Sequence, residues 1–83
     1  MYRVIIPQKV QKELAGVENK YRLKISAALI SLEKNPFIGK KLEGEFKGLW
    51  SYRVWPHRII YQIKQKGLII LVVRIGQRQG IYK

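Results

Sequence analysis

Residues 49–75 read LWSYRVWPHRIIYQIKQKGLIILVVRI. Apolar or aromatic side chains occupy every second position in three parts of this stretch, and a period of two is typical of β-strands. The alternation predicts strands at residues 49–55, 58–64 and 68–75. Because only two or three residues separate consecutive strands, we expect them to form an antiparallel meander.

The first half of the chain predicts one more strand and two helices. Residues 2–6 are rich in β-branched side chains, which suits a strand. Pro7 is well placed to start a helix that ends near Gly16. A longer helix follows and ends at Asn35-Pro36, because the residue before a proline disfavours the helical conformation. Its apolar stripe at helical spacing consists of Val17, Tyr21, Ile25, Ala28, Leu29 and Leu32.

These elements predict an α+β fold in a single domain that covers residues 1–83. The expected order is β-α-α-β-β-β, with both helices packed on one face of an antiparallel sheet that the first strand joins. Residues 37–48 contain three glycines and are expected to form a connecting loop.

Strand alternation also predicts which side chains share a face of the sheet. In each strand one set is apolar or aromatic and is expected to lie under the helices. In the last strand this set consists of Ile69, Leu71, Val73 and Ile75. The opposite face is expected to carry Arg53, Arg58 and Arg74. Charged residues on an open sheet face are either simply solvated or bind an anion.

The charge of the chain favours the second alternative. The sequence holds 17 basic and five acidic residues, which gives a formal net charge of +12, and residues 46–83 contain no acid at all. A polyanionic partner is expected, because binding to phosphates releases condensed counterions. The planar fork of arginine matches phosphate oxygens, while Trp55 and Tyr82 offer rings on which bases can stack. The open face therefore suits single-stranded RNA.

Several classes of protein are excluded by composition. There is no cysteine, so disulfides and thiolate metal sites cannot form, and a single histidine cannot build a zinc site. We expect no metal or other cofactor. The longest near-apolar run, residues 68–73, is too short to span a bilayer, and the N-terminus lacks a signal-peptide pattern. A cytoplasmic protein is expected.

A series of motifs extends over nearly the whole chain. They are Asn35-Pro36-Phe37, Gly48-Leu49-Trp50-Ser51, His57-Arg58-Ile59-Ile60-Tyr61, Arg74-Ile75-Gly76-Gln77-Arg78 and Ile81-Tyr82-Lys83. In their order, spacing and total length the chain resembles the RelE/ParE superfamily of type II toxin–antitoxin toxins, and within it the RelE branch of mRNA interferases. The resemblance implies a RelE-like fold, a small antiparallel sheet with two helices on one side.

The same resemblance implies an activity and partners. Such a protein is an endoribonuclease that cleaves mRNA in the ribosomal A site through attack of the ribose 2′-OH, and thereby inhibits translation. It contacts ribosomal RNA and is held inactive by a cognate antitoxin, which is expected to be small and acidic.

The resemblance also implies site residues. Arg58 and Arg78 match phosphate-binding arginines, Tyr82 matches a tyrosine that stacks on the nucleobase and is a proposed proton carrier, and Arg53 matches a basic position on the preceding strand. Arg74 and Trp55 are expected to contact RNA or the ribosome. The lysines of the predicted loop, Lys40, Lys41 and Lys47, either contact ribosomal RNA or are solvated.

The identity of the general base stays open. Many relatives have a histidine where Gln77 stands, and the conventional alternatives here are Glu43, Glu45 and His57. His57, in a predicted turn, is expected to be structural or solvated rather than catalytic. This departure keeps two other functions in consideration: a ParE-like toxin that inhibits DNA gyrase without cleaving RNA, and an inactive RNA-binding relic of a toxin.

Overall fold

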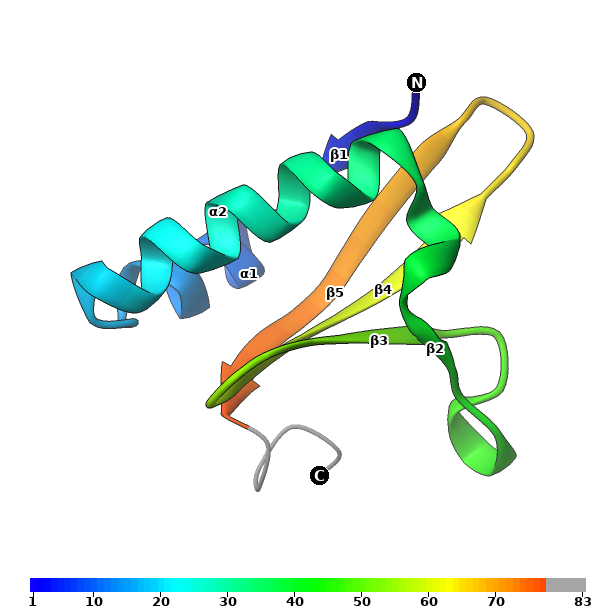
Figure 1. The fold of residues 1–83 in the computed structure, drawn as a ribbon. Coiled ribbons are helices and arrows are strands. Elements are labelled where there is room, and N and C mark those ends of the chain that lie inside the picture. Colours follow the sequence, from blue (N-terminus) through cyan, green and yellow to red (C-terminus); the bar gives the residue numbers. More distant parts are fainter. Residues whose placement is uncertain (78–83) are drawn as a thin grey trace.

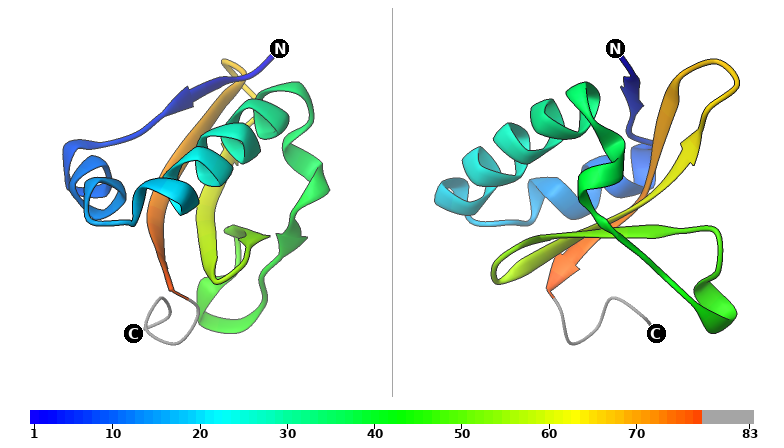
Figure 2. Two further views of the ribbon diagram at one scale, coloured as in Figure 1. Left: turned by 60° about the vertical axis from the view of Figure 1, so that its left-hand side comes forward. Right: turned by 45° about the vertical axis from the view of Figure 1, so that its right-hand side comes forward.

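The computed structural model describes residues 1–77, which fold into a five-stranded sheet with two helices on one of its faces (Figures 1 and 2). The predicted α+β class and the predicted order of strands and helices are confirmed. The main elements are β1 (Arg3–Ile5), α1 (Gln8–Ala15), α2 (Asn19–Lys34), β3 (Trp50–Val54), β4 (His57–Lys64) and β5 (Ile69–Gln77).

The segment predicted as a plain loop contains short elements of its own. They are the 3₁₀ helices η1 (Pro36–Ile38) and η2 (Gly44–Phe46) and the two-residue strand β2 (Lys40–Lys41). Asn35 ends α2 as predicted, and its side-chain oxygen accepts a hydrogen bond of 3.1 Å from the Phe37 N–H at the start of η1. No helix within residues 1–77 is long and apolar enough to cross a membrane.

The strand order is β1-β5-β4-β3-β2. The predicted meander of β3, β4 and β5 is antiparallel, and β2 adds to β3 in the same sense. β1 lies parallel to β5, so the sheet is mixed rather than purely antiparallel. A parallel pair is possible here because no tight turn joins β1 to β5: both helices and the other three strands lie between them in the chain.

The assignment of the β5 side chains to the two faces was wrong for the first part of the strand. Tyr61 pairs with Val72 and Ile60 pairs with Arg74, so Val73 is an extra residue in a β-bulge. One inserted residue reverses the alternation that follows it. Ile70, Val72 and Ile75 are therefore in the core, whereas Val73, predicted to face the helices, is 36 % exposed and Ile69 and Leu71 are partly exposed.

Tyr61 anchors the segment that follows α2 to the centre of the sheet. Its side chain is fully buried, and its hydroxyl donates a hydrogen bond of 2.7 Å to the Pro36 carbonyl. Burial raises the pKa of Tyr61 to about 12, because the phenolate would lose its hydration. This contact fixes the position of η1 and hence of β2, which follows it directly.

The pKa of Tyr61 gives a first prediction. One of the five tyrosines should ionise near pH 12, above the usual value of 10.0. Since the pKa is raised in the folded state, the neutral side chain contributes stability that is fully present below pH 10 and is lost as the pH rises toward 12. Ultraviolet titration, with circular dichroism to monitor folding, should show this late step, and Tyr61→Phe should remove it. A single common transition near pH 10 in the folded protein would contradict the assignment.

Candidate functional site

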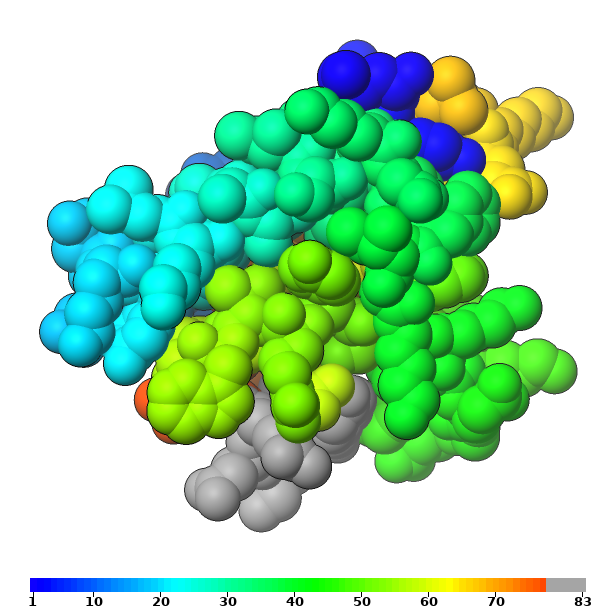
Figure 3. Space-filling model, in the orientation of Figure 1, coloured from blue at the N-terminus to red at the C-terminus, as the bar shows by residue number. Residues whose placement is uncertain are grey.

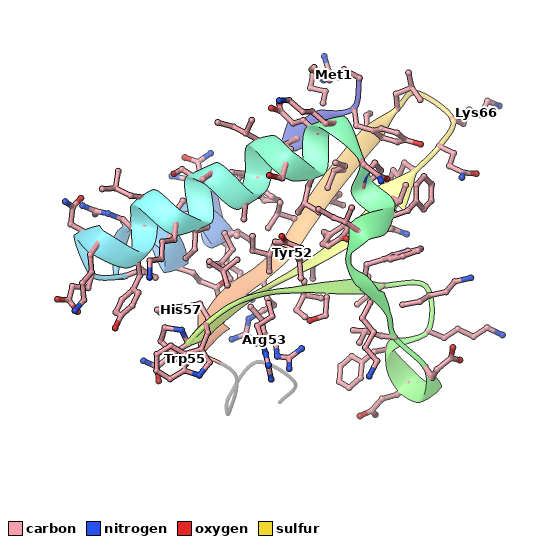
Figure 4. The ribbon with its side chains drawn as sticks, viewed as in Figure 1. Met1, Tyr52, Arg53, Trp55, His57 and Lys66 are labelled. Atoms are coloured by element: carbon pink, nitrogen blue, oxygen red, sulfur yellow. The ribbon has the colours of Figure 1, made fainter. Side chains whose placement is uncertain are left out.

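The face of the sheet opposite the helices carries a row of basic side chains at the β2–β3–β4 end. Residues that lie directly opposite one another in neighbouring strands point to the same face. Lys40 pairs with Ser51, and Arg53 pairs with Arg58, while the apolar residues of β3 and β4 pack against the core under the helices. In Figure 4, Arg53 extends from β3 on the side away from α2.

The Arg53–Arg58 pair brings two positive charges close together. A two-residue turn joins Val54 to His57, and this closing pair is hydrogen-bonded in a hairpin of that length. The ladder alternates, so Arg53 and Arg58 form a non-hydrogen-bonded pair, in which the side chains approach most closely. Like charges in such a pair destabilise the sheet unless an anion lies between them.

These residues line a cleft of about 470 Å³ whose walls come from the start of β2 and from β3 and β4. Figure 3 shows the segment that follows α2 (green) beside β3 (yellow-green). This segment forms one wall of the cleft. The lining consists of Ile38, Gly39, Lys40, Ser51, Tyr52, Arg53 and Arg58. No carboxylate of residues 1–77 contributes to it, so neither Glu43 nor Glu45 is part of the lining.

Arg58 is held in a fixed orientation and keeps hydrogen-bonding capacity unused. Its Nη1 donates to Ser51 Oγ at 3.0 Å, and Ser51 is only 2 % exposed. Its Nε is buried and has no hydrogen-bond partner within residues 1–77. A buried donor without a partner costs about 1–3 kcal/mol, and more when it is charged. An anion bound in the cleft would neutralise the arginine pair and offset this cost.

The other described residues that we predicted to contact RNA lie outside this cleft. Lys41 pairs with Trp50 and so points to the opposite face, where its Nζ lies 6.0 Å from the centre of the indole ring. Lys47 is exposed and outside the lining, whereas Trp55 is 69 % exposed in the turn between β3 and β4. Arg78 and Tyr82 lie outside the described residues.

Arg74 takes part in a contact that sequence patterns did not indicate. It pairs with Ile60 on the open face, but its Nε donates to Glu13 Oε2 of α1 at 3.0 Å. The other oxygen of Glu13 accepts a bond of 3.1 Å from the Ile75 N–H. The carboxylate thus closes the part of the β5 edge that β1 does not cover, next to the bulge.

His57 is the first residue of β4 and points toward the helices rather than into the cleft. It is 6 % exposed, and its ring centre lies 5.3 Å from that of Tyr21. We expected His57 to be structural or solvated in a turn, and its burial in a strand was not predicted. Sequence reasoning also missed Gly39 and Tyr52, although both line the cleft. Short loop glycines and half-buried aromatics carry no signal for such a role.

The Glu13 contact gives a second prediction, on stability. Glu13→Ala should lower the free energy of unfolding by about 1–3 kcal/mol, because Ile75 N–H and Arg74 both lose their acceptor. Glu13→Gln should cost less, since the amide oxygen still accepts one bond. Urea denaturation measures the difference, with Glu45→Ala, at an exposed glutamate, as the matched control. Equal stability of Glu13→Ala and the wild type would show that the contact is dispensable.

Comparisons with known proteins place this chain in a family. A family model described as the ParE toxin of the type II toxin–antitoxin system parDE matches residues 4–82. None of the curated proteins is significantly similar to the sequence.

Solved structures of RelE toxins share the fold. The RelBE2 toxin–antitoxin complex from Mycobacterium tuberculosis superposes with a TM-score of 0.86 at 22% identity, over 93% of this chain and 98% of that one. The RelE–RelB complex from Pyrococcus horikoshii gives 0.82 at 26% identity, over 95% and 97%. The isolated RelE toxin of E. coli gives 0.80 at 18% identity, over 93% and 84%. The chain therefore belongs to the ParE toxin family of type II toxin–antitoxin systems, within the RelE/ParE superfamily.

Proposed function

We propose that this toxin is a ribosome-dependent mRNA endoribonuclease, which cleaves through attack of the ribose 2′-OH and thereby inhibits translation in the cytoplasm. The observation that supports the proposal best is the cross-strand arginine pair in a cleft to which residues 1–77 contribute no carboxylate, with Arg58 Nε buried and unpartnered among the same residues. These features favour binding of a phosphodiester.

The arginine pair would act on the charge that develops during cleavage. Attack of the 2′-OH gathers negative charge on the phosphorane oxygens, and fixed donors stabilise that charge more than they stabilise the ground state. Ser51 holds one arm of the Arg58 guanidinium, so its remaining donors are already oriented. Arg53 and Lys40 add positive charge at the same cleft. We propose that Arg78 and Tyr82 complete the catalytic set.

The described residues offer few candidates for the groups that transfer protons during cleavage. Among the lining side chains, Lys40 offers an ammonium group and Tyr52 a phenolic hydroxyl for proton transfer, and Tyr82 remains a proposed carrier. The ribosome would contribute by holding the RNA with its 2′-OH in line with the leaving oxygen.

The wider surface would bind RNA and the ribosome. Trp55 is exposed enough for a base to stack on its ring, and Lys47 is exposed beside the cleft segment. Lys41 would contact RNA from the helix-covered side of the sheet. Arg74 would contribute through its partly exposed guanidinium while it remains bound to Glu13. A cognate acidic antitoxin would cover the basic surface, and the solved relatives include toxin–antitoxin complexes.

A second candidate function is inhibition of DNA gyrase without RNA cleavage. It is favoured by the family model, which describes ParE toxins and matches almost the entire chain. A toxin of this kind would need the basic surface for a protein or DNA contact, and not for chemistry on a phosphodiester.

Toeprinting on translating ribosomes separates the two functions. Cuts at fixed positions within codons, produced by the purified toxin and suppressed by antitoxin, would support the nuclease. A gyrase supercoiling assay run with the same preparation tests the alternative. Intact mRNA on the ribosome, together with loss of supercoiling activity, would refute the nuclease and support the gyrase inhibitor.

A further inference from the structure

A second cavity lies at the edge of the sheet where α1 packs against β5. Its volume is about 520 Å³, which is in the range of sites for small ligands. One wall comes from the end of α1 and the start of α2, and the other comes from the start of β4 and the end of β5. Within residues 1–77, no residue lines both this cavity and the cleft of the arginine pair, so the two sites are separate.

The edge of β5 presents backbone groups to this cavity. β1 covers that edge only from Ile69 to Leu71. The Ile75 N–H donates to Glu13 Oε1, so the backbone groups of Ile75 point away from β4. Groups on one side of a strand recur at every second residue, so the Ile75 carbonyl and the Gln77 N–H point the same way. Among residues 1–77 no strand pairs with these two groups.

This edge offers an acceptor, the Ile75 carbonyl, and a donor, the Gln77 N–H, two residues apart. A complementary ligand carries a donor next to an acceptor on one edge of its ring. Adenine does so, because its exocyclic amino group adjoins a ring nitrogen with a free lone pair. Cytosine carries the same two groups, but its single ring covers less apolar surface.

The side chains of the cavity suit a flat, uncharged ring better than a phosphate. The apolar and aromatic part of the lining consists of Val17, Tyr21, His57 and Ile75. A nucleobase gains stacking and apolar contact from such a wall. The carboxylates of Glu13 and Glu18 outnumber the ammonium group of Lys12 in the same lining, so a phosphate is disfavoured there and an amino group is favoured.

We propose that this cavity binds an adenine base, whose amino group donates to the Ile75 carbonyl and whose adjacent ring nitrogen accepts from the Gln77 N–H. The base belongs either to an RNA strand or to a free adenine nucleotide. In both cases the phosphate lies outside the cavity, where Lys20 and Lys24 approach the ring of Tyr21. The inference requires neither the nuclease activity nor inhibition of gyrase.

Adenosine is the probe for the first test, because it has no phosphate for a chain of net charge +12 to attract. At saturation it should slow amide exchange of the Gln77 N–H in the full chain at least about tenfold, the equivalent of one hydrogen bond. The Gly76 N–H, which points to β4, should be unchanged. Purine riboside lacks only the amino group and should bind about tenfold more weakly. Equal affinity of the two nucleosides would overturn the proposal.

A substitution tests the same hydrogen bond from the side of the protein. Gln77→Pro removes the N–H, and because this N–H points away from β4, the ladder is kept. The variant should bind adenosine about tenfold more weakly, whereas Gln77→Ala keeps the N–H and should bind like the wild type. Circular dichroism shows whether both are folded, and the purine riboside comparison needs no variant. Full affinity of folded Gln77→Pro, or no binding of adenosine at its solubility limit, would also overturn the proposal.

Two further ligands identify the source of the base. If a free nucleotide is bound, AMP should bind more tightly than adenosine. If RNA is bound, an oligouridine with one central adenosine should protect the Gln77 N–H and AMP should gain nothing over adenosine. Equal protection by an oligouridine without adenosine would refute base recognition. None of these measurements depends on cleavage, so failure of the nuclease assay and failure of the base site are distinguishable.

Discussion

Arg58→Ala is expected to lower the rate of mRNA cleavage on the ribosome by about 10²–10³-fold, the usual cost of losing one fixed donor to a developing oxyanion. Two features of Arg58 support so large an effect. Its guanidinium is oriented by Ser51, and its charge lies beside that of Arg53 in a cleft to which residues 1–77 contribute no carboxylate. Growth arrest on expression should disappear with the cleavage.

The matched control is Arg3→Ala. Arg3 pairs with Ile69 on the same open face, at the opposite end of the sheet, and its replacement removes the same charge. Electrostatic attraction of RNA by the whole surface would make the two variants similarly weak, whereas a phosphate site makes only Arg58→Ala inactive. Arg58→Lys keeps the charge and loses the fork, so it should recover only part of the rate.

Circular dichroism and thermal unfolding must accompany these assays. Arg58→Ala removes a hydrogen bond to Ser51 but also relieves the repulsion with Arg53, so the folded state should keep most of its stability. A folded Arg58→Ala variant with wild-type cleavage would show that the arginine pair is not the site of chemistry.

The part of the site that sequence patterns predicted is the part fixed by a tight turn. Two residues separate Val54 from His57, so the alternation along β3 dictates that along β4, and Arg53 and Arg58 had to share a face. The same reasoning assigned the first residues of β5 to the wrong faces, because the bulge at Val73 shifts the alternation. Before Arg74 both sets of alternate residues in that strand are apolar, so the pattern contains no information about the extra residue.

Sequence patterns could not predict contacts between distant parts of the chain, for a different reason. Strand alternation groups Arg74 with Arg53 and Arg58, and residues 46–83 contain no acid to pair with it, but its partner Glu13 comes from α1, 61 positions earlier. Lys40 and Lys41 looked like one cluster until a two-residue strand placed them on opposite faces. A strand this short has no recognisable period, so only tertiary packing reveals it.

The packing that positions β2 depends on Gly39, and Gly39→Ala is expected to be strongly destabilising. The backbone of Gly39 is ordinary extended chain, so the restriction is one of space. An added Cβ would overlap the Tyr61 hydroxyl, and it would lie 2.9 Å from the Ser51 carbonyl oxygen and 3.1 Å from Tyr61 Cζ. Relief requires movement of β2 away from β3 or rotation of Tyr61 away from Pro36.

Such overpacking typically costs about 1–3 kcal/mol. For a domain of this size each kcal/mol lowers the melting temperature by roughly 4–8 °C, so calorimetry will resolve the change. Gly16→Ala is the matched control. A Cβ at Gly16 lies 3.6 Å or more from its nearest neighbours, so that variant should be neutral or gain about 0.4–1 kcal/mol from the stiffer unfolded chain.

A double-mutant cycle with Tyr61→Phe identifies the cause. Tyr61→Phe alone should destabilise, because the Pro36 carbonyl loses its donor. In that background the closest atom to the new methyl group is gone, so Gly39→Ala should cost clearly less than it does in the wild type. Additive effects would show that Gly39 is required for a reason other than Tyr61. Because Gly39 precedes Lys40 in the wall of the cleft, we expect Gly39→Ala to lose cleavage activity even below its melting temperature, and Tyr61→Phe to restore part of it.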